Sequence, residues 1–579
     1  MKPKIALYTG ISLLSLAGGL LYITGLGKVA GYVLALLSIV LLARFLAKLV
    51  ASREFTVDLL MAVVGIVTLY YGLLVEGLII LLLYGIAETM EEFIEARAEK
   101  EIEAIASHVR DKVLKEYAGK AIEVDVRRVE PGDVIIVRVG EAVPLDGEAL
   151  GDGVIDASLV TGEPLPVEVK PGDLVLSGSL VVEGPLRLRV LKRFEESHLA
   201  RLVRLAREAV ETKPRVTRVI ERLTPLLTLL VLGLFAPVLY LYGPVKALPI
   251  ILVGCPSAFI ISSAFLASYS IARLARHGIL VRNAGVLEAM SDVTAVVLDK
   301  TGTLTELRVD PERVEPPPGY GKMEFLGIVG SYAKYSRHPV SRALHGYSMD
   351  ESLSVREVRG VGLVGSSGGL QVEIRGGRLE ECGKLLEAVV NGASGYICLR
   401  EELRHGAREL VSFLKSRGVR VVMASGDDPG NVARVARMLG IEEYYGGMKP
   451  EDKARLVGEL QGEGYRVAFV GDGVNDSVAL ARADVGVAVG ELDVARKVAD
   501  VSVRGTPSQL LELFMYGMRL KPSIMAAFYS AGLLKLLVGS LGIAGLIGLP
   551  VVAFLGDDGS TFTGLGVGLY RLGWGSRGR

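Results

Sequence analysis

The sequence predicts a multidomain α+β membrane protein: an eight-helix transmembrane bundle, a small β-rich domain, and a doubly wound α/β domain that carries an α+β insert. Half of the 579 residues are hydrophobic and mean hydropathy is positive, which is unusual for soluble domains. Long uncharged runs form three groups along the chain. Of the two polar regions between these groups, one shows the period-two alternation of strands and the other alternates strand and helix patterns.

Eight apolar runs are predicted to be membrane spans, each of which takes roughly 20 mostly apolar residues; Arg44 and Lys48 can snorkel at the end of the second run. In groups of four, two and two, they cover residues 5–27, 29–43, 59–75, 76–87, 223–245, 247–272, 522–543 and 546–570. Glu76 interrupts the fourth run, Lys535 the seventh, and Asp557 and Asp558 the eighth. Buried core helices are the alternative interpretation, but they rarely run past about 20 residues without a charge.

The arrangement of the spans predicts how the chain is oriented. An even number of spans precedes each polar region, 94–215 and 274–520, so both regions and both chain ends are expected on one side of a cell membrane. Basic residues mark that side as cytoplasmic: Arg44, Lys48, Arg53, Arg571, Arg577 and Arg579. The expected environment of the spans is membrane lipid.

Charge and cysteine content exclude some classes of protein. Lysine plus arginine equal aspartate plus glutamate at 65 each, so a nucleic-acid partner is not expected. The three cysteines, Cys255, Cys382 and Cys398, imply no disulfide framework and place the polar regions in a reducing compartment.

Acidic residues follow three predicted strands of the larger polar region. The β-branched run 294–298 ends at Asp299, the run 419–423 stops just before Asp427, and the run 466–470 leads to Asp472. A fourth run covers 485–489. Strand–helix alternation predicts a parallel sheet whose ligand site lies at the carboxyl ends of its strands. One such acid usually caps the next helix, but three would lie close together and need a divalent cation such as Mg²⁺.

The segment that starts at Asp299 reads DKTGTLT and resembles the phosphorylation motif of P-type ATPases. The resemblance implies a haloacid-dehalogenase-like domain in which Asp299 attacks the γ-phosphate of ATP. Two anions repel, so this attack requires Mg²⁺ and positive charge. By resemblance, Asp299, the Thr301 carbonyl and Asp472 bind the Mg²⁺, and Asp476 of GDGVND supports the site.

Two further motifs extend the resemblance around the phosphate. Lys453, the last residue of PEDK, is similar to the family's lysine that contacts phosphoryl oxygens. Ser425, Gly426 and Asp427 resemble the family's TGD, with serine keeping the hydroxyl of threonine.

The insert at 308–400 contains SRHP at 336–339 and GVG at 360–362. By itself an exposed histidine before proline is ordinary loop chemistry. The resemblance is to the nucleotide-binding domain of heavy-metal pumps, in which His338 would contact adenine while Gly360 and Gly362 let the backbone approach the nucleotide. The family usually has glutamate where Ala333 stands.

The smaller polar region is rich in valine and glycine and alternates with period two near 122–126, which predicts a β-rich domain. Its TGEP segment, read alone, predicts a β-turn. Together with DKTGTLT it resembles the loop of the P-type actuator domain. Thr161, Gly162 and Glu163 would form that loop, and Glu163 would be the base that orients water for hydrolysis of the aspartyl phosphate.

Cys255, Pro256 and Ser257 interrupt the sixth span. Proline removes a backbone hydrogen bond and frees carbonyls, and a thiolate beside it suits soft or borderline cations. A small buried cysteine at a kink is the alternative. The segment resembles the Cys-Pro-x motif of heavy-metal pumps.

Acids inside the last span indicate a cation site, with Lys535 as their counter-ion. Asp557 and Asp558 resemble the last-span motifs of the zinc/cadmium and cobalt/zinc classes, so Zn²⁺, Cd²⁺ or Co²⁺ is favoured and Cu(I) or Ag(I) is the alternative. By resemblance, Glu76 and Glu88 lie on the ion's route.

The predicted domains follow from these motifs. They are transmembrane helices 1–4 (1–93), the actuator domain (94–215), transmembrane helices 5–6 (216–273), the phosphorylation domain (274–307 and 401–520), the nucleotide-binding domain (308–400) and transmembrane helices 7–8 (521–579). ATP and Mg²⁺ are the expected cofactors, a transition-metal ion the cargo, and the chain is expected to act as a monomer. A membrane-anchored phosphatase and a metal-binding regulator with a degenerate ATPase are the competing hypotheses.

Overall fold

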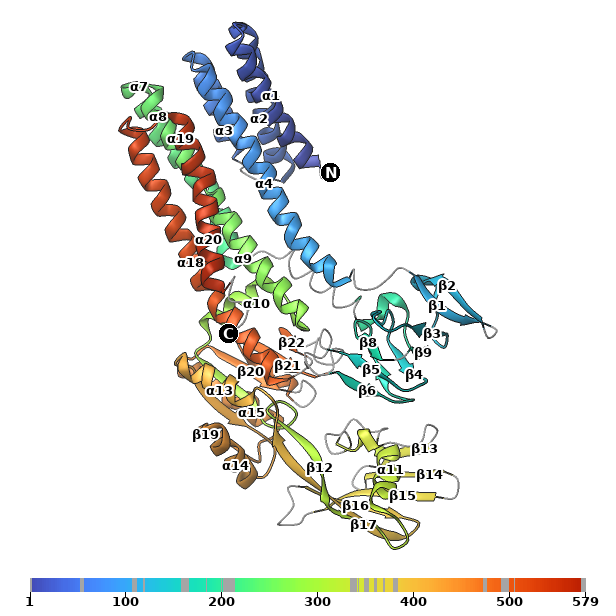
Figure 1. Ribbon diagram of the computed structural model, residues 1–579. Helices are drawn as coiled ribbons and strands as arrows, with labels where there is room; N and C mark the ends of the chain where they lie inside the picture. The colour runs from blue at the N-terminus through green and yellow to red at the C-terminus, as the bar shows by residue number, and fades with distance from the viewer. Residues whose placement is uncertain are drawn as a thin grey trace.

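The computed structural model places a bundle of long helices at one end of the molecule and three β-containing units at the other (Figure 1). It describes residues 3–52, 57–106, 112–117, 120–157, 166–183, 185–198, 200, 214–333, 341, 343–347, 354–358, 362–367, 370–377, 384–471, 476–490, 499–503 and 506–573.

Five helical segments in the described part of the chain are long and apolar enough to cross a membrane: Lys4–Ile23, Gly27–Ala51, Arg215–Tyr242, Pro244–Arg276 and Pro507–Ile543. They include α1 (Pro3–Ile23), α2 (Gly27–Ser52) and α7 (Arg215–Tyr242). The apolar helix α3 (Asp58–Tyr70) is shorter, and α4 (Leu74–Ala106) spans 33 residues. A multi-pass membrane protein is therefore confirmed, whereas the number of eight spans stays a prediction.

The sixth predicted span is divided into two helices. α8 (Pro244–Val253) ends before Gly254, and α9 (Ser257–Arg276) starts directly after Pro256. Proline has no backbone N–H and its ring crowds the preceding turn, which favours an interruption of the helix at this point. The predicted interruption is present, and it places Cys255 in the gap between α8 and α9.

The helix that contains the seventh span starts earlier than predicted. α18 (Pro507–Ile543) is continuous through Pro522, so the predicted domain boundary at 520/521 falls inside one helix. Buried side chains on its first turns, Leu510, Leu513 and Phe514, pack into the α/β domain, and this packing outweighs the hydrogen bond lost at proline. The boundary at 93/94 likewise falls inside α4.

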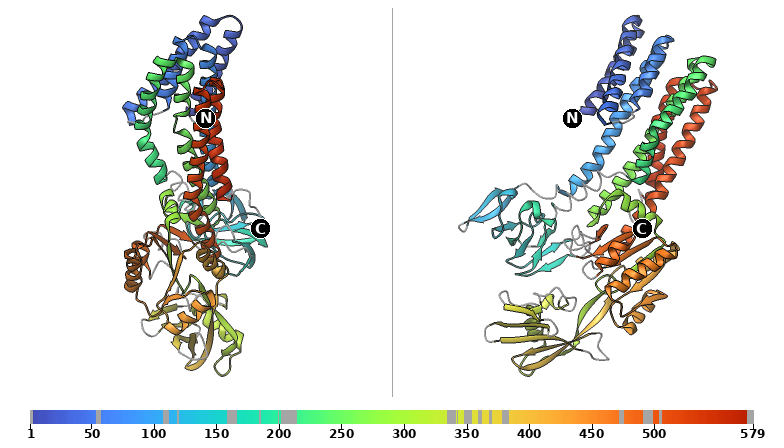
Figure 2. Two further views of the ribbon diagram at one scale, coloured as in Figure 1. Left: turned by 90° about the vertical axis from the view of Figure 1, so that its left-hand side faces the viewer. Right: turned by 180° about the vertical axis from the view of Figure 1, so that it is seen from behind.

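The last predicted span is also divided. A short helix, α19 (Leu549–Ala553), is followed by a single π-helical turn, η5 (Phe554–Gly559), and by α20 (Ser560–Leu572). In the two views of Figure 2, α18 and α20 lie side by side, in agreement with their extensive contact.

The α/β domain contains a seven-stranded sheet with the order β10-β22-β21-β20-β11-β18-β19. Neighbouring strands are parallel except for β10 against β22. The strands are β10 (Ile279–Val281), β11 (Ala295–Asp299), β18 (Arg420–Ala424), β19 (Glu443–Tyr445), β20 (Val467–Gly471), β21 (Val485–Val489) and β22 (Val501–Val503). The helices are α10 (Ala284–Ala289), α13 (Ala407–Ser416), α14 (Pro429–Leu439), α15 (Pro450–Gly462) and α16 (Ser477–Arg482). Every β-branched run that predicted a strand is one.

The insert is attached through two long antiparallel strands, β12 (Thr305–Glu315) and β17 (Ala393–Leu403), which begin beside the α/β sheet. Its own sheet has the order β12-β17-β16-β15-β14-β13, with β13 (Ser354–Val358), β14 (Gly362–Ser367), β15 (Leu370–Gly377), β16 (Lys384–Val390) and the helix α11 (Lys322–Ala333). The insert was predicted to begin at residue 308 and end at residue 400. Both positions lie inside these two strands rather than in loops, and Arg308 pairs directly with Arg400.

Cys398 on β17 is disulfide-bonded. The sequence predicted no disulfide framework, and this single disulfide-bonded cysteine was not foreseen. Cysteine number alone does not exclude a single bridge, because two cysteines suffice when the fold brings them within bonding distance.

The β-rich unit has two antiparallel sheets, β2-β1-β3-β9-β4-β7 and β6-β5-β8. Its strands are β1 (Lys112–Tyr117), β2 (Lys120–Asp125), β3 (Val134–Val137), β4 (Gly147–Ala149), β5 (Gly153–Asp156), β6 (Val167–Val169), β7 (Leu174–Val175), β8 (Leu180–Glu183) and β9 (Leu186–Val190). The burial of β9 alternates strictly, as period-two patterning requires.

Removing a core side chain of the α/β sheet tests this fold. Phe469 on β20 is fully buried, and Phe469→Ala is expected to destabilise the domain by about 3–5 kcal/mol because it leaves a cavity. The measurement is the thermal unfolding midpoint of the purified chain. Val478→Ala removes a half-exposed side chain from the same domain and is the matched control; equal midpoints for both variants would contradict the described core.

Candidate functional site

Three charged side chains meet at the carboxyl end of the central strand β11. Asp299 is the last residue of this strand, and its Oδ1 accepts a hydrogen bond from Nζ of Lys453 at 2.6 Å. The same ammonium donates to Oδ1 of Asp476 at 2.7 Å. All three side chains are buried. Lys453 comes from the first turn of α15, and Asp476 is the residue before α16.

The charges of this group support one another. Burial alone would lower the pKa of Lys453, but the carboxylates of Asp299 and Asp476 outweigh it and hold that pKa above its usual value. Lys453 therefore stays protonated at physiological pH, and its positive charge stabilises two carboxylates that would otherwise repel each other.

The loop after Asp299 is fixed by its own backbone. The amides of Leu304 and Thr305 donate to the Lys300 carbonyl, and Gly302 adopts φ +78°, which favours glycine. Arg404 donates to the Gly302 carbonyl at 2.7 Å. Thr301 belongs to this turn as the bridge partner of Thr305, which is consistent with a role for its carbonyl oxygen.

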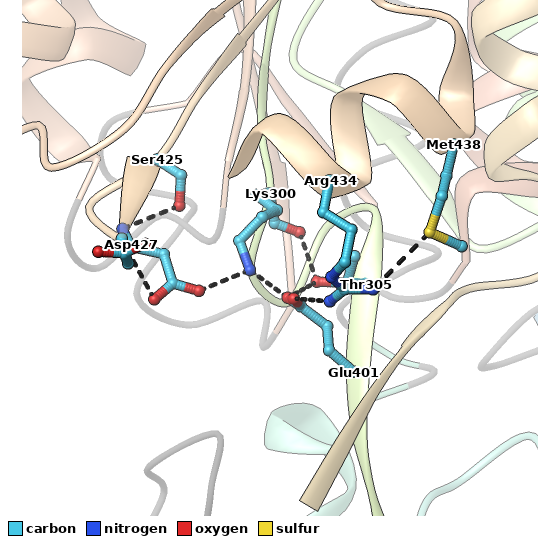
Figure 3. Close-up of polar contacts among 8 residues, drawn as sticks. Lys300, Thr305, Glu401, Ser425, Asp427, Arg434 and Met438 are labelled. Atoms are coloured by element: carbon cyan, nitrogen blue, oxygen red, sulfur yellow. Dashed lines mark hydrogen bonds and ion pairs between the residues drawn. The ribbon is translucent and has the colours of Figure 1, made fainter. Parts of the chain in front are cut away.

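A second charged group, which sequence reasoning missed, surrounds Lys300 (Figure 3). Lys300 is completely buried; its ammonium pairs with Glu401 on β17 and lies 2.7 Å from Oδ2 of Asp427. Glu401 also accepts a hydrogen bond from Thr305 at 2.8 Å and pairs with Arg434 of α14 at 3.3 Å. The available signal was a lysine inside the nucleophile motif, since a buried lysine requires a carboxylate partner.

Ser425, Gly426 and Asp427 follow β18, as predicted. The Ser425 hydroxyl accepts a hydrogen bond from the Asp427 amide at 3.2 Å, and an added Cβ on Gly426 would approach the Met448 carbonyl to 3.2 Å. The Asp427 carboxylate faces Lys300 (Figure 3). The strand-end acids are thus divided between two lysines: Asp299 pairs with Lys453, and Asp427 with Lys300.

Several predicted site residues lie outside the described residues: Asp472, Thr161, Gly162, Glu163, His338 and Gly360. Gly362 is the first residue of β14. No group of three or more His, Cys, Asp or Glu side chains arranged to hold a metal occurs in the described ranges, which lack Asp472. The oxygen donors that are described, carboxylates of Asp299 and Asp476 and the carbonyl of Thr301, are of the type that Mg²⁺ prefers.

The interrupted membrane helices bring together most of the predicted cation site. Oδ1 of Asp557 accepts a hydrogen bond from the Ser257 hydroxyl at 2.9 Å and another from Nζ of Lys535 at 3.1 Å. The thiol of Cys255 is buried and free, and its sulfur accepts from the Ser257 amide at 3.4 Å. Lys535 is buried in α18, Ser257 begins α9, and Asp557 lies in the segment between α19 and α20, so three helical segments converge on Asp557.

Asp557 and Asp558 both lie in the π-helical turn η5. Such turns widen a helix locally and are frequent at functional sites. The Asp557 carbonyl accepts hydrogen bonds from the hydroxyls of Ser560 at 2.7 Å and Thr561 at 3.1 Å. The sequence did not predict this turn; consecutive acids and glycines were its only signal.

Glu76 does not belong to this cluster in the described residues. It lies in the first turn of α4 and makes no hydrogen bond or ion pair there with Ser257, Lys535 or Asp557. Glu88 lies twelve residues further along the same helix.

Comparisons with known proteins agree with this geometry. The P-type ATPase actuator domain model matches residues 103–207, and the haloacid dehalogenase-like hydrolase model matches 293–484. The zinc/cadmium/lead-transporting P-type ATPase of Escherichia coli is 30% identical over 540 residues, 87% of this chain and 73% of that protein. The copper-exporting P-type ATPase B of Archaeoglobus fulgidus is 32% identical over 474 residues, 75% of this chain and 68% of that protein.

A crystal structure of a zinc-transporting PIB-type ATPase in the E2.Pi state superposes with a TM-score of 0.54 at 27% identity, covering 98% of this chain and 99% of that one. Together with these relatives, a strand-end aspartate paired with lysine and joined to a helical membrane bundle identifies an ATP-driven pump that uses ATP and Mg²⁺. The chain belongs to the P-type ATPases, in their heavy-metal-transporting class. The phosphatase and regulator hypotheses are thereby set aside.

The Lys300 group yields a prediction about stability. Glu401→Gln removes the negative charge that pairs with both Lys300 and Arg434. We expect the free energy of unfolding to fall by about 1–3 kcal/mol, because the buried Lys300 ammonium loses part of its negative partner. The thermal midpoint of the purified chain measures it. Glu402→Gln, on the same strand but 44% exposed with its Arg308 contact at 3.7 Å, is the control; a midpoint for Glu401→Gln equal to that of the control would rule out a stabilising role.

Proposed function

We propose that this chain exports a divalent transition-metal ion, Zn²⁺, Cd²⁺ or Co²⁺, and that transport is driven through an aspartyl phosphate on Asp299. The observation that carries the choice of ion is the Asp557 carboxylate, which contacts Ser257 and Lys535 next to the Cys255 thiol. One sulfur donor combined with carboxylate oxygens suits a borderline divalent ion better than Cu(I), which prefers sulfur alone.

Phosphoryl transfer follows from the position of Asp299. One carboxylate oxygen forms a bond to the γ-phosphorus of ATP while the bond to the bridging oxygen of ADP breaks. Lys453 supplies positive charge beside this oxygen, at 2.6 Å in the structure. Asp299, Thr301, Asp472 and Asp476 would hold Mg²⁺, which when bound screens the negative charge of the phosphates.

Hydrolysis regenerates Asp299. A water oxygen bonds to phosphorus, the bond to the Asp299 oxygen breaks, and the water's proton passes to a base. We assign this base to Glu163, and Thr161 and Gly162 to the loop that presents it. We assign His338, Gly360 and Gly362 to the nucleoside end of ATP, and Ser425, Gly426 and Asp427 to its phosphate end.

In the membrane, Cys255, Ser257, Asp557 and Asp558 are the proposed donors to the transported ion, together with carbonyls left free at Pro256. Lys535 is the proposed built-in counter-ion, since its ammonium occupies Asp557 and a cation arriving there would displace it. Glu76, in the first turn of α4, is proposed to lie on the route by which the transported ion is released.

Cu(I) export is the second candidate. It is favoured by similarity to the Archaeoglobus fulgidus copper exporter, whereas the Escherichia coli relative named for zinc, cadmium and lead shares a longer aligned region. The Asp557 carboxylate at the cation site favours the divalent ion over Cu(I).

The placement in the cell is part of the proposal. Exposed tyrosines gather at one set of helix ends, Tyr70, Tyr240 and Tyr242, as is typical of a lipid–water boundary. The polar regions and both described ends lie toward the other side, the proposed cytoplasm. The proposed domains are 94–215 as actuator, 308–400 as nucleotide-binding domain, and 274–307 with 401–520 as phosphorylation domain; the chain is proposed to work as a monomer within lipid.

Replacing the nucleophile tests the phosphorylation step. Asp299→Asn is expected to abolish the acid-stable, hydroxylamine-labile phosphoenzyme formed from labelled ATP, since an amide cannot attack phosphorus, and to lower turnover by about 10³-fold or more. Glu442→Gln, an exposed acid of the same domain, should label like the wild type. Labelling of Asp299→Asn would refute the assignment.

A metal panel tests the choice of ion. We expect ATPase stimulation by Zn²⁺, Cd²⁺ or Co²⁺ in purified protein, and a reduction of that stimulation by about tenfold or more in Asp557→Asn and Cys255→Ala, each of which loses a ligand. Thr563→Val, which removes an exposed hydroxyl that donates to the Gly559 carbonyl, is the control. Stimulation by Cu⁺ and Ag⁺ alone would select the second candidate.

A further inference from the structure

Four polar side chains meet inside the bundle formed by α1 to α4. Asp58, the first residue of α3, is 1% exposed. Its Oδ2 lies 3.2 Å from Nε of Arg44 on α2. Its Oδ1 accepts hydrogen bonds from the hydroxyls of Tyr84 on α4 at 3.0 Å and Tyr8 on α1 at 3.3 Å. Each of the four helices contributes one side chain to this group, the Asp58 cluster.

The rings and charges of the cluster also pack against one another. The guanidinium carbon of Arg44 lies 4.3 Å from the centroid of the Tyr8 ring, within the range of a cation–π contact. The rings of Tyr8 and Tyr84 meet edge to face at 5.8 Å, a favoured arrangement of aromatic pairs. Buried charges are costly to desolvate even when they are paired, whereas apolar side chains suffice to pack a bundle. The cluster therefore requires a role beyond packing.

The helix α4 links the cluster to the cation site. Glu88 follows Tyr84 by one helical turn and so shares its face, and it lies within electrostatic reach of Asp58, Arg44 and Asp557. On its other side α4 contacts α9, α19 and η5, the elements around Asp557. Next to Tyr84, a Cβ on Gly85 would lie 2.9 Å from the Tyr8 carbonyl, so α1 and α4 approach each other directly beside the cluster.

The same helix extends far beyond the bundle. It continues to Ala106, toward the β-rich unit (Figures 1 and 2). A movement of that unit would be transmitted along α4, so a polar anchor at Tyr84, about one third of the way along this 33-residue helix, would limit how far the helix rotates or slides.

We propose that the Asp58 cluster is a positioning device for transport: it fixes α4 against α1, α2 and α3 so that Glu88 faces the cation site around Asp557. This proposal rests on the proposed function of that site. Tyr8, Arg44, Asp58 and Tyr84 are positioning residues, because none of them contacts Ser257 or Asp557 in the described contacts. Losing the anchor changes how readily the cation reaches the site from the cytoplasm and leaves the phosphoryl chemistry intact.

Two variants and one control test the proposal in the full chain reconstituted in lipid. Tyr84→Phe removes one hydrogen bond and keeps the ring. The double variant Arg44→Leu with Asp58→Leu removes both charges together and leaves neither of them unpaired, which buried pairs generally tolerate. Ser15→Ala, in α1, removes a buried hydroxyl that has no hydrogen-bond partner among the described residues.

The readouts are the KM and kcat of Zn²⁺-stimulated ATPase activity and phosphorylation of Asp299 by inorganic phosphate without Zn²⁺. We expect KM for Zn²⁺ to rise about fivefold in Tyr84→Phe and about tenfold or more in the double variant, with kcat within about twofold. Phosphorylation by inorganic phosphate should stay at the wild-type level, and Ser15→Ala should match the wild type throughout.

Two results would overturn the proposal. An unchanged KM in the folded double variant would show that the cluster positions nothing. Equal losses of kcat and of phosphorylation by inorganic phosphate, with a lower thermal midpoint, would show that it only holds the bundle together. Failure of the proposed function would give a different result: the ATPase activity of the wild-type protein would not be stimulated by Zn²⁺, Cd²⁺ or Co²⁺.

Discussion

The ammonium of Lys453 between Asp299 and Asp476 is the interaction on which the phosphorylation site depends. Two carboxylates buried at the end of a parallel strand repel each other, and a single cation at 2.6 and 2.7 Å makes their proximity stable. The sheet supplies the geometry, because β11 lies between β18 and β20 and all three end at the same edge. One strand away, the ammonium of Lys300 likewise lies between two carboxylates, those of Glu401 and Asp427.

The sequence predicted those parts of the molecule that follow from periodicity and from fixed motifs. The strands before Asp299, Asp427 and Asp472 were predicted because buried parallel strands are continuous β-branched runs. The helix interruption at Pro256 was predicted because the proline ring has a local effect. The resemblance to P-type ATPases located Lys453, which lies on α15 beside Asp299 although the two residues are 154 positions apart in the chain.

The remaining features arise from tertiary packing, which a local pattern does not contain. The continuity of α18 through Pro522 depends on contacts of Phe514 and its neighbours with the α/β domain. Glu401 meets Lys300 because its strand pairs with β12, a contact that no local pattern around Glu401 contains. The Asp58 cluster draws one residue from each of four helices, and no spacing along the chain links Tyr8 to Tyr84.

The unbroken course of α18 has a mechanical consequence. Lys535 lies 28 positions beyond Pro507, which corresponds to about 42 Å of helix at 1.5 Å per residue. A stiff rod of that length amplifies rotation at its base: a tilt of about 5° would carry its far end sideways by roughly 4 Å. That displacement exceeds the 3.1 Å between Lys535 and Asp557, so a slight rocking of the sheet is enough to make or break their contact.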